Sequence, residues 1–172
     1  CTLTEMKILH VLFNLDPEWG GPPRVACSMA ASQARLGHDV TILCSYGDGR
    51  SPGLPTAFCK IPGIDKVRVV NLQAPGKIEL FLTIRAQKAL RRLVTADSVL
   101  HIHGVWEPIL WAAARAAIRV GAPYIVRPLS VLNTWGMQRY LIRKAVAFRL
   151  GVNLMMKRAA FIHALTDAEA EM

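Results

Sequence analysis

The chain has 172 residues, a length that suits one domain with a sizeable core. Its residues are 52% hydrophobic and its mean hydropathy is +0.28, which argues against extended disorder over most of the length. The formal net charge is +9, and no apolar run reaches the roughly 18–20 residues that span a bilayer.

The first ten residues, CTLTEMKILH, lack the basic, apolar and small-residue layout of a secretory signal peptide. The four cysteines, Cys1, Cys27, Cys44 and Cys59, show neither a CxxC motif nor a metal-ligand spacing. We therefore expect reduced, mostly buried thiols, no metal site and a cytosolic protein.

The positive charge is concentrated in one part of the chain. The stretch 1–107 has twelve Lys and Arg residues against nine Asp and Glu, whereas the stretch 108–166 has nine Lys and Arg and no carboxylate. Such a one-sided block predicts a surface that meets an anionic partner: membrane lipid, a phosphorylated substrate or nucleic acid.

The first half of the chain predicts a strand, a helix and a second strand. Lys7–Leu12 is a short apolar run typical of a buried parallel strand. A loop rich in Gly and Pro follows, and then a helix over Val25–Leu36 that ends at Gly37. His38–Cys44 is the second predicted strand, and Ser45–Lys66 is predicted to be loop.

The second half alternates in the same way. Further strands are predicted over Val67–Leu72, Val99–Val105, Tyr124–Leu129 and Phe161–Leu165. Helices are predicted over Lys77–Ala96, Ile109–Val120 and Gly136–Ala160, with a break at Gly151, and again from Asp167. Apolar strands that alternate with helices indicate an α/β fold: a Rossmann-like parallel sheet with helices on both faces. Ligands bind beyond the carboxyl ends of the strands in such sheets.

Gly20 and Gly21 lie between the first strand and the first helix. Glycine allows the backbone to approach a ligand closely, and the N–H groups at the start of the helix can bind an anion. A tight turn that needs a positive φ explains the pair equally well. The GxGxxG motif and its acidic partner are missing, which disfavours a nicotinamide-dependent oxidoreductase.

A second group of candidates follows the fourth strand. His101 and His103 lie on either side of Ile102, and we expect them to point to opposite faces of the sheet, which disfavours a two-histidine metal site. His103, at the strand end, is the candidate catalytic residue, although a structural histidine is as plausible. Trp106 and Glu107 come next, and the carboxylate suits a sugar hydroxyl, a proton-accepting role or the start of a helix.

Arg127, Asn133 and Trp135 surround the end of the fifth strand. Arginine pairs with phosphate in a bidentate manner, and tryptophan can form a platform for a sugar or a lipid, although packing and plain surface positions remain open for each.

The long basic helix that follows interleaves cations with large apolar residues, which is typical of a helix lying on anionic lipid. Its first cations, the candidate membrane contacts, are Arg139, Arg143 and Lys144. A solvated helix face is the alternative, and no nucleic-acid-binding module is recognisable.

Five segments in this order resemble the N-terminal domain of family 4 (group 1) glycosyltransferases of the GT-B fold. They are KILHVL, EWGGPPRVACSMAASQARLGHDVTILC, HIHGVWEP, APYIVRPLSVLNTWGM and KRAAFIHALTDAEAE. The resemblance covers 6–172 and implies that residues 1–172 form one acceptor-side domain, with the C-terminal donor domain absent.

The resemblance implies that Gly20 and Gly21 lie beside the donor phosphates and the acceptor, with His103 and Trp106 on the acceptor side. It makes the cleft residues substrate-binding candidates: Gly20, Gly21, Trp106, Glu107, Arg127, Ser130, Asn133 and Trp135. Many family members carry a His-Gly pair after the fifth strand, whereas this chain has Leu129 and Ser130. A family branch with RPLG at this point is similar to the RPLS found here.

The activity implied is that of a hexosyltransferase in polysaccharide biosynthesis. It would move a sugar from a nucleotide-sugar co-substrate to a glycan or lipid-linked acceptor, without a metal or other cofactor, at the cytoplasmic face of a membrane. The isolated chain would then be inactive. The alternative is a non-catalytic module that binds an acceptor or a partner, and the reading frame beyond Met172 separates the two.

Overall fold

The computed structural model describes residues 4–46, 53–72, 83–129 and 145–170. Within these residues, six parallel strands form one sheet in the order β3-β2-β1-β4-β5-β6. The strands are β1 (Lys7–Asn14), β2 (Asp39–Tyr46), β3 (Arg68–Asn71), β4 (Ser98–His103), β5 (Tyr124–Arg127) and β6 (Phe161–Ile162). This is the strand order of a Rossmann fold, so the predicted fold class is confirmed.

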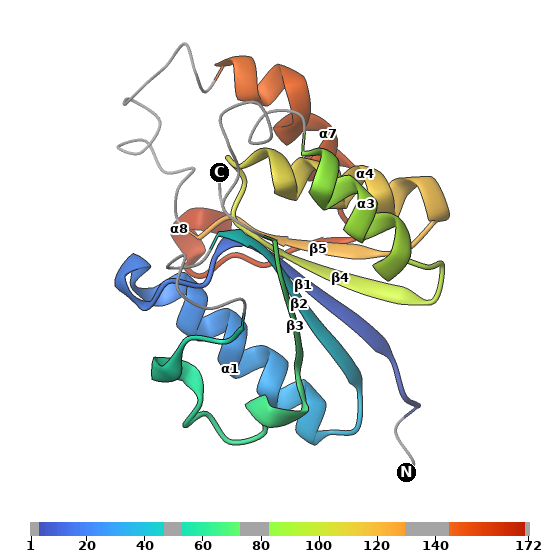
Figure 1. The fold of residues 1–172 in the computed structure, drawn as a ribbon. Helices are drawn as coiled ribbons and strands as arrows, with labels where there is room; N and C mark the ends of the chain where they lie inside the picture. The colour runs from blue at the N-terminus through green and yellow to red at the C-terminus, as the bar shows by residue number, and fades with distance from the viewer. Residues whose placement is uncertain (1–3, 47–52, 73–82, 130–144, 171–172) are drawn as a thin grey trace.

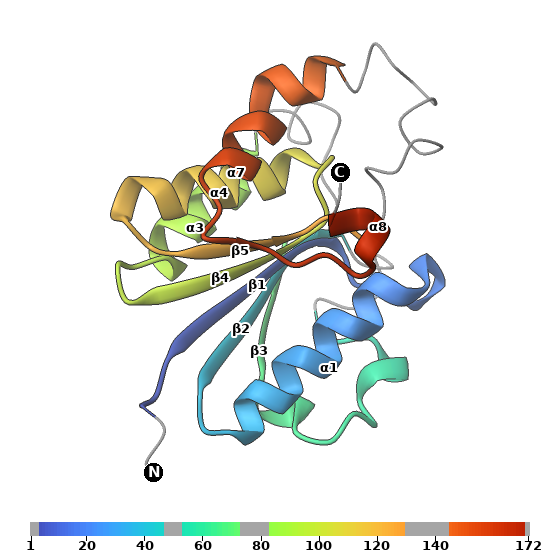
Figure 2. The same ribbon diagram turned by 180° about the vertical axis from the view of Figure 1, so that it is seen from behind.

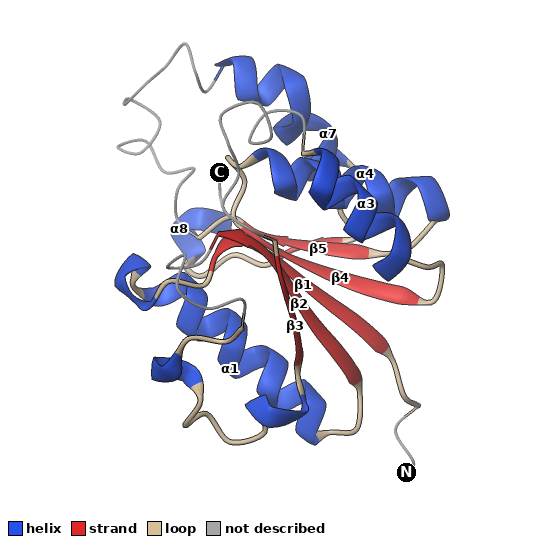
Figure 3. Cartoon of the chain, viewed as in Figure 1, coloured by secondary structure: helices blue, strands red, loops and turns tan. Residues whose placement is uncertain are grey.

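Helices cover both faces of the sheet. The α-helices are α1 (Gly21–Arg35), α3 (Ile84–Leu93), α4 (Pro108–Val120), α7 (Asn153–Lys157) and α8 (Asp167–Ala170). Short 3₁₀ helices are η1 (Pro17–Trp19), η2 (Thr56–Phe58) and η3 (Ile64–Lys66), and η4 (Phe148–Val152) is a π-helical turn. Helix α1 lies on one side of the sheet, and α3, α4 and α7 lie on the other (Figures 1 and 3).

The alternation of side chains along β1 divides the core into two parts. Leu9 and Val11 pack with α3 and α4, whereas Ile8 and Leu12 pack with α1. Both faces of the strand are therefore apolar, as the uninterrupted run in the sequence predicted.

Several boundaries differ from the predicted ones. Strand β1 continues two residues past Leu12, to Asn14. Helix α1 begins at Gly21 rather than Val25, because prolines fit the first turn of a helix, where no N–H partner is needed. Strand β5 stops at Arg127, and β6 ends at Ile162. The stretch predicted to be loop contains η2 and η3.

The long C-terminal helix is described from residue 145. The break predicted at Gly151 is instead the π-helical turn η4, which continues into α7. Val152 and Met155 of this segment are buried in the core. Among the described residues, none of the helices is long and apolar enough to cross a membrane.

Three cysteines lie in described parts of the chain, and each is a thiol rather than half of a disulfide. Cys27 and Cys44 are buried, whereas Cys59 is exposed. Burial raises the pKa of the Cys27 thiol to about 12, which makes it an unreactive core residue.

Candidate functional site

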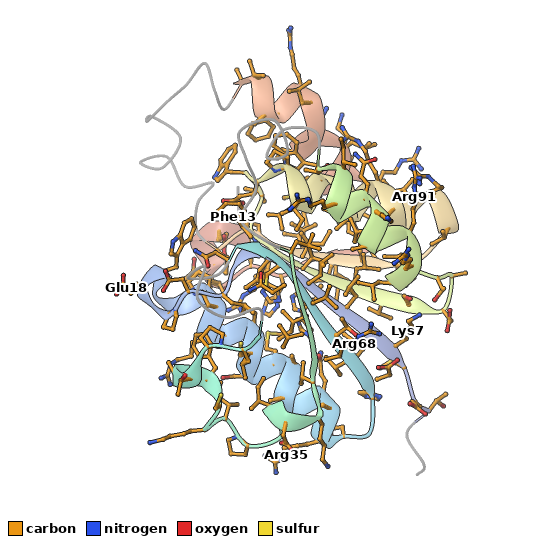
Figure 4. The ribbon with its side chains drawn as sticks, viewed as in Figure 1. Lys7, Phe13, Glu18, Arg35, Arg68 and Arg91 are labelled. Atoms are coloured by element: carbon orange, nitrogen blue, oxygen red, sulfur yellow. The ribbon has the colours of Figure 1, made fainter. Side chains whose placement is uncertain are left out.

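A pocket of about 220 Å³ opens at the carboxyl ends of β1, β4 and β5. It is lined by Leu12, Phe13, Asn14, Trp19, Pro22, Pro23, His103, Gly104, Val105, Trp106, Glu107, Pro128 and Leu129. Phe13 marks this end of β1, and Lys7 lies at the opposite end (Figure 4). The strand order reverses between β1 and β4, so the pocket occupies the position where Rossmann-like sheets bind ligands.

The apolar wall of the pocket includes three aromatic side chains: Phe13, Trp19 and Trp106. The rings of Phe13 and Trp19 pack with their centroids 5.6 Å apart, and 54% of Trp19 is exposed. Trp106 packs edge-on against Phe148, with centroids 5.7 Å apart. Aromatic walls with a few polar groups are characteristic of small-molecule sites.

The polar groups of the pocket are Asn14, His103 and Glu107. The side-chain oxygen of Asn14 accepts a hydrogen bond of 2.7 Å from the backbone N–H of Asp16. Its Nδ2 is buried and has no hydrogen-bond partner among the described residues. Burial raises the pKa of Glu107, although backbone N–H groups that donate to the carboxylate oppose this shift. The pocket thus offers a buried amide donor and a carboxyl group that protonates more readily than usual.

His101 and His103 lie on the same face of the sheet, and the expectation of opposite faces was wrong. Residues two apart in a strand point in the same direction, because side chains alternate with a period of two. The two rings stack with centroids 4.5 Å apart, on the face that α1 covers. His10 of β1 joins them, with its ring 5.3 Å from that of His101 and 5.2 Å from that of His103.

Hydrogen bonds connect two of these histidines to α1. Nδ1 of His10 lies 2.9 Å from Nε2 of His103, and Nε2 of His10 lies 2.6 Å from Oε1 of Gln33. All three histidines are buried. Burial lowers the pKa of each of them, to about 3 for His101, and neighbouring charges strengthen the shift for His101 and His103. The three rings are therefore neutral at neutral pH.

The three histidines are close enough to suggest a metal site, since one ligand nitrogen from each lies within 4.8 Å of the others. A metal ion binds in the plane of an imidazole ring, along the nitrogen lone pair. In this arrangement both ring nitrogens of His10 are already used in hydrogen bonds, one with His103 and one with Gln33, so neither is free to face an ion. The arrangement fits a stacked, neutral, hydrogen-bonded cluster.

Arg127 is not among the residues that line the pocket. Its guanidinium donates to the sulfur of Met29 on α1 at 3.7 Å, and its Nε has no partner among the described residues. Burial lowers the pKa of Arg127, and the charge of Glu169 opposes that shift. The next two residues, Pro128 and Leu129, reach the pocket, and Leu129 has a φ of 63°. A positive φ is uncommon for a leucine and marks strain at the pocket edge.

The two glycines have different conformations. Gly20 has φ 79° and ψ −130°, a combination open essentially to glycine alone, so the need for a positive φ at this turn is real. Gly21 is the first residue of α1 and has space around it. Neither lines the pocket, but their neighbours Trp19 and Pro22 do.

Six candidate residues fall outside the part of the chain that the structure describes. They are Ser130, Asn133, Trp135, Arg139, Arg143 and Lys144. Their substrate-binding and membrane-contact roles remain predictions.

The structure adds Phe13, Asn14 and His10 to the site. Phe13 was missed because the first strand was expected to stop at Leu12, two residues early. Asn14 lay in the loop expected at the ligand-binding edge of the sheet, but it was not singled out as a polar contact. A polar residue directly after a buried strand would have indicated Asn14. The meeting of His10 and His101 depends on the register between β1 and β4, which the sequence does not contain.

Comparison with known proteins identifies the family. The family model described as a glycosyl transferase 4-like domain matches residues 20–172. The chain belongs to the glycosyltransferase 4-like family. The match begins at Gly20, so it contains the walls of the pocket that β4, α1 and the end of β5 supply.

The fold of this glycosyltransferase 4-like chain is also similar to a solved structure. That structure is a candidate UDP-N-acetylglucosamine 2-epimerase of Listeria monocytogenes, with a TM-score of 0.64 and 14% identity. The similarity covers 98% of this chain and 41% of the other, so the chain spans less than half of its structural neighbour. A search of curated proteins finds no significant match.

Proposed function

We propose that this chain is the acceptor-binding half of a hexosyltransferase, which moves a sugar from a nucleotide-sugar to a glycan or lipid-linked acceptor. The observation that carries the proposal is the aromatic pocket at the point where the strand order reverses, with Asn14, His103 and Glu107 as its polar groups. Aromatic faces pack on sugar rings, and buried polar groups fix the orientation of hydroxyl groups. A second, donor-binding domain would complete the reaction.

Binding of a pyranoside to the chain tests the pocket. In an NMR titration with methyl α-glucoside, methyl α-mannoside and methyl β-galactoside, we expect at least one to shift the indole signals of Trp19 and Trp106. Glu107→Gln keeps the shape of the side chain but removes its charge, and hydrogen bonds to charged groups are worth about 1.5–3 kcal/mol. The variant is therefore expected to bind the same glycoside about tenfold or more weakly.

The matched control is Glu18→Gln. Glu18 is exposed on η1 and lies outside the pocket lining (Figure 4). If no glycoside moves either indole signal, or if both variants lose the same affinity, the pocket is not an acceptor site.

A non-catalytic acceptor-binding module is the second candidate. Leu129 favours it, because this side chain stands at the pocket where many family members carry a histidine. A donor-hydrolysis assay on the longest natural product of the gene separates the candidates, since turnover requires an enzyme.

We further propose that an anionic membrane surface is a partner and that the acceptor is met there, at the cytoplasmic face. Together with Arg158, directly after α7, the helical layer formed by α3, α4, η4 and α7 carries nine exposed cations and no carboxylate among its described residues. The cations are Arg85, Lys88, Arg91, Arg92, Arg115, Arg119, Arg149, Lys157 and Arg158. Each cation close to anionic lipid contributes about 1 kcal/mol.

An apolar stripe lies beside these cations. Val146, Leu150 and Leu154 are 50%, 56% and 43% exposed and are spaced four residues apart, so they share one face of the helical segment. Apolar residues between cations are typical of helices that lie in the membrane interface, and the charge of the layer favours anionic lipid over a protein partner.

Vesicle sedimentation tests the membrane partner. The chain is expected to sediment with vesicles of phosphatidylglycerol and phosphatidylcholine, and not with phosphatidylcholine alone. Leu150→Gln should weaken binding about tenfold, since burying a leucine side chain is worth about 1.5–3 kcal/mol. The control is Leu36→Gln, because Leu36 is 59% exposed at the end of α1, on the other side of the sheet. Equal sedimentation with both vesicle types would contradict the proposal.

A further inference from the structure

A short line of hydrogen bonds runs from α1 along the face of the sheet that α1 covers to the pocket. It starts at Oε1 of Gln33, passes through both ring nitrogens of His10 and ends at Nε2 of His103, over contacts of 2.6 and 2.9 Å. Helix α1 crosses this face of the sheet (Figure 2). His10 and His103 are almost fully buried, at 0% and 3% exposure.

The amide oxygen at the start of the line determines where each proton lies. A carbonyl oxygen only accepts, so Nε2 of His10 must carry the hydrogen that Gln33 accepts. In a neutral ring the other nitrogen has a lone pair, so Nδ1 of His10 accepts from Nε2–H of His103. His103 is then left with a lone pair on Nδ1.

Two facts keep His103 in the neutral form on which this reasoning depends. Burial lowers the pKa of His103 well below its ordinary value, and the neighbouring histidines and Arg127 lower it further. A second proton on the ring would also bring a charge next to the guanidinium of Arg127. The lone pair on Nδ1 is therefore present at neutral pH.

Nδ1 of His103 is buried and has no hydrogen-bond partner among the described residues. Buried polar atoms in folded proteins are nearly always paired, so an unpaired one calls for an explanation, such as a functional role or a bound water or ion. His103 lines the pocket together with Asn14, whose Nδ2 donor is also unpartnered. One acceptor and one donor are the complement of a hydroxyl group, which both donates and accepts.

We propose that Nδ1 of His103 accepts a hydrogen bond from a ligand hydroxyl in this pocket, and that Gln33 and His10 are positioning residues that fix its lone pair. The inference deepens the proposed function, on which it rests for the identity of the ligand as a sugar. It assigns a role to Gln33, which lies on α1 outside the pocket lining.

The proton positions can be measured without any ligand. Long-range ¹H–¹⁵N correlation spectra of the chain labelled with ¹⁵N-histidine distinguish the two neutral forms of each ring. We expect His10 and His103 each in a single form with the proton on Nε2. A proton on Nδ1 of His103, or an equal mixture of forms, would overturn the inference, since reversal of the Gln33 amide would reverse every donor and acceptor along the line.

Variants of Gln33 test the positioning role. Gln33→Met has a similar length but offers no acceptor oxygen, so His10 and His103 should become mixtures of both forms. Gln33→Glu restores an acceptor oxygen and should restore the single form. Far-ultraviolet circular dichroism shows whether each variant is folded. A single form retained in Gln33→Met would mean that the amide does not direct the protons.

Deoxygenated sugars test the ligand contact. The probe is the methyl glycoside that shifts the tryptophan signals of the wild-type chain, compared with its four monodeoxy derivatives. One derivative should bind at least tenfold more weakly than its parent to the wild type, and this difference should shrink in Gln33→Met. If the parent binds but no derivative stands out, the hydroxyl contact is wrong while the acceptor pocket stands. If no glycoside binds, both the proposed function and the hydroxyl contact are wrong. The ¹H–¹⁵N spectra still show in which direction the hydrogen bonds from Gln33 to His103 are donated.

Discussion

Lowering the pH from 7 to 5 is expected to reduce the free energy of unfolding of this chain by about 2–4 kcal/mol. The cause is the cluster of His10, His101 and His103, whose pKa values in the folded protein are all lowered by burial. Small domains are stable by about 5–15 kcal/mol, so a loss of this size removes a substantial part of the stability of the chain at pH 5.

The direction follows from the proton balance. An unfolded histidine has a pKa of about 6.5, whereas the folded ring stays neutral, down to about pH 3 for His101. Below pH 6.5 the unfolded state therefore binds protons that the folded state does not, and stability is lost as the pH falls. Each such proton costs about 1.4 kcal/mol per pH unit. The pKa of Glu107 is raised in the folded protein, so this group favours the folded state as the pH falls. It is a single group, and it offsets only part of the loss caused by the three histidines.

Urea unfolding at a series of pH values between 7.5 and 5 measures this dependence. His101→Leu removes one titrating ring, and Nε2 of His101 has no hydrogen-bond partner among the described residues. The loss between pH 7 and pH 5 should therefore shrink by about 2 kcal/mol in this variant.

The control for the acid effect is His38→Gln, at a half-buried histidine outside the cluster. Its pH dependence should equal that of the wild type. An unchanged pH dependence in His101→Leu would show that the buried cluster is not the origin of the acid sensitivity.

Much of the fold could be predicted because its determinants are local. Apolar runs indicated the strands, and a glycine indicated where a helix ends: Gly37, directly after the C-terminal cap of α1, has a φ of 91°. The boundaries were less certain, because nothing local distinguishes the last residue of a strand from the first residue of a loop. For this reason the predicted site lacked Phe13, which lies one residue past the predicted end of the first strand.

The histidine cluster was missed for two different reasons. His101 and His103 share a face because side chains two residues apart in a strand point the same way, so the sequence was sufficient to predict it. The third ring, that of His10, joins them because β1 and β4 are neighbouring strands whose register places His10 opposite His101. Contacts across a sheet between distant segments depend on the whole topology, so the network that reaches Gln33 required the structure.

The π-helical turn η4 was also beyond local prediction, and it leads to the second large effect. Replacement of Gly151 by alanine is expected to destabilise the chain by about 2 kcal/mol or more. A Cβ at this position would lie 2.7 Å from Cβ of Trp111 and closer still to its Cγ and Cδ2. Forcing an extra carbon into a well-packed core costs about 1–3 kcal/mol, and occasionally more.

Trp111 cannot move aside without a further loss. Its indole N–H donates a 2.7 Å hydrogen bond to the backbone oxygen of Val105, and the residue is packed in the core. Alanine gains up to about 1 kcal/mol over glycine in a helix, which offsets only part of the clash. For a chain of this size the net loss corresponds to a fall in melting temperature of about 4–8 °C.

Thermal unfolding followed by circular dichroism measures the effect, and Gly21→Ala is the control. An added Cβ at Gly21 meets no atom within 4 Å, so this variant should melt within about 2 °C of the wild type. The decisive comparison repeats Gly151→Ala in a Trp111→Ala background, where Cγ and Cδ2 are gone. The alanine at position 151 should then cost clearly less, because most of the clash has been removed. An equal loss in both backgrounds would mean that the π-helical turn needs glycine for its own backbone rather than for the close approach of the indole.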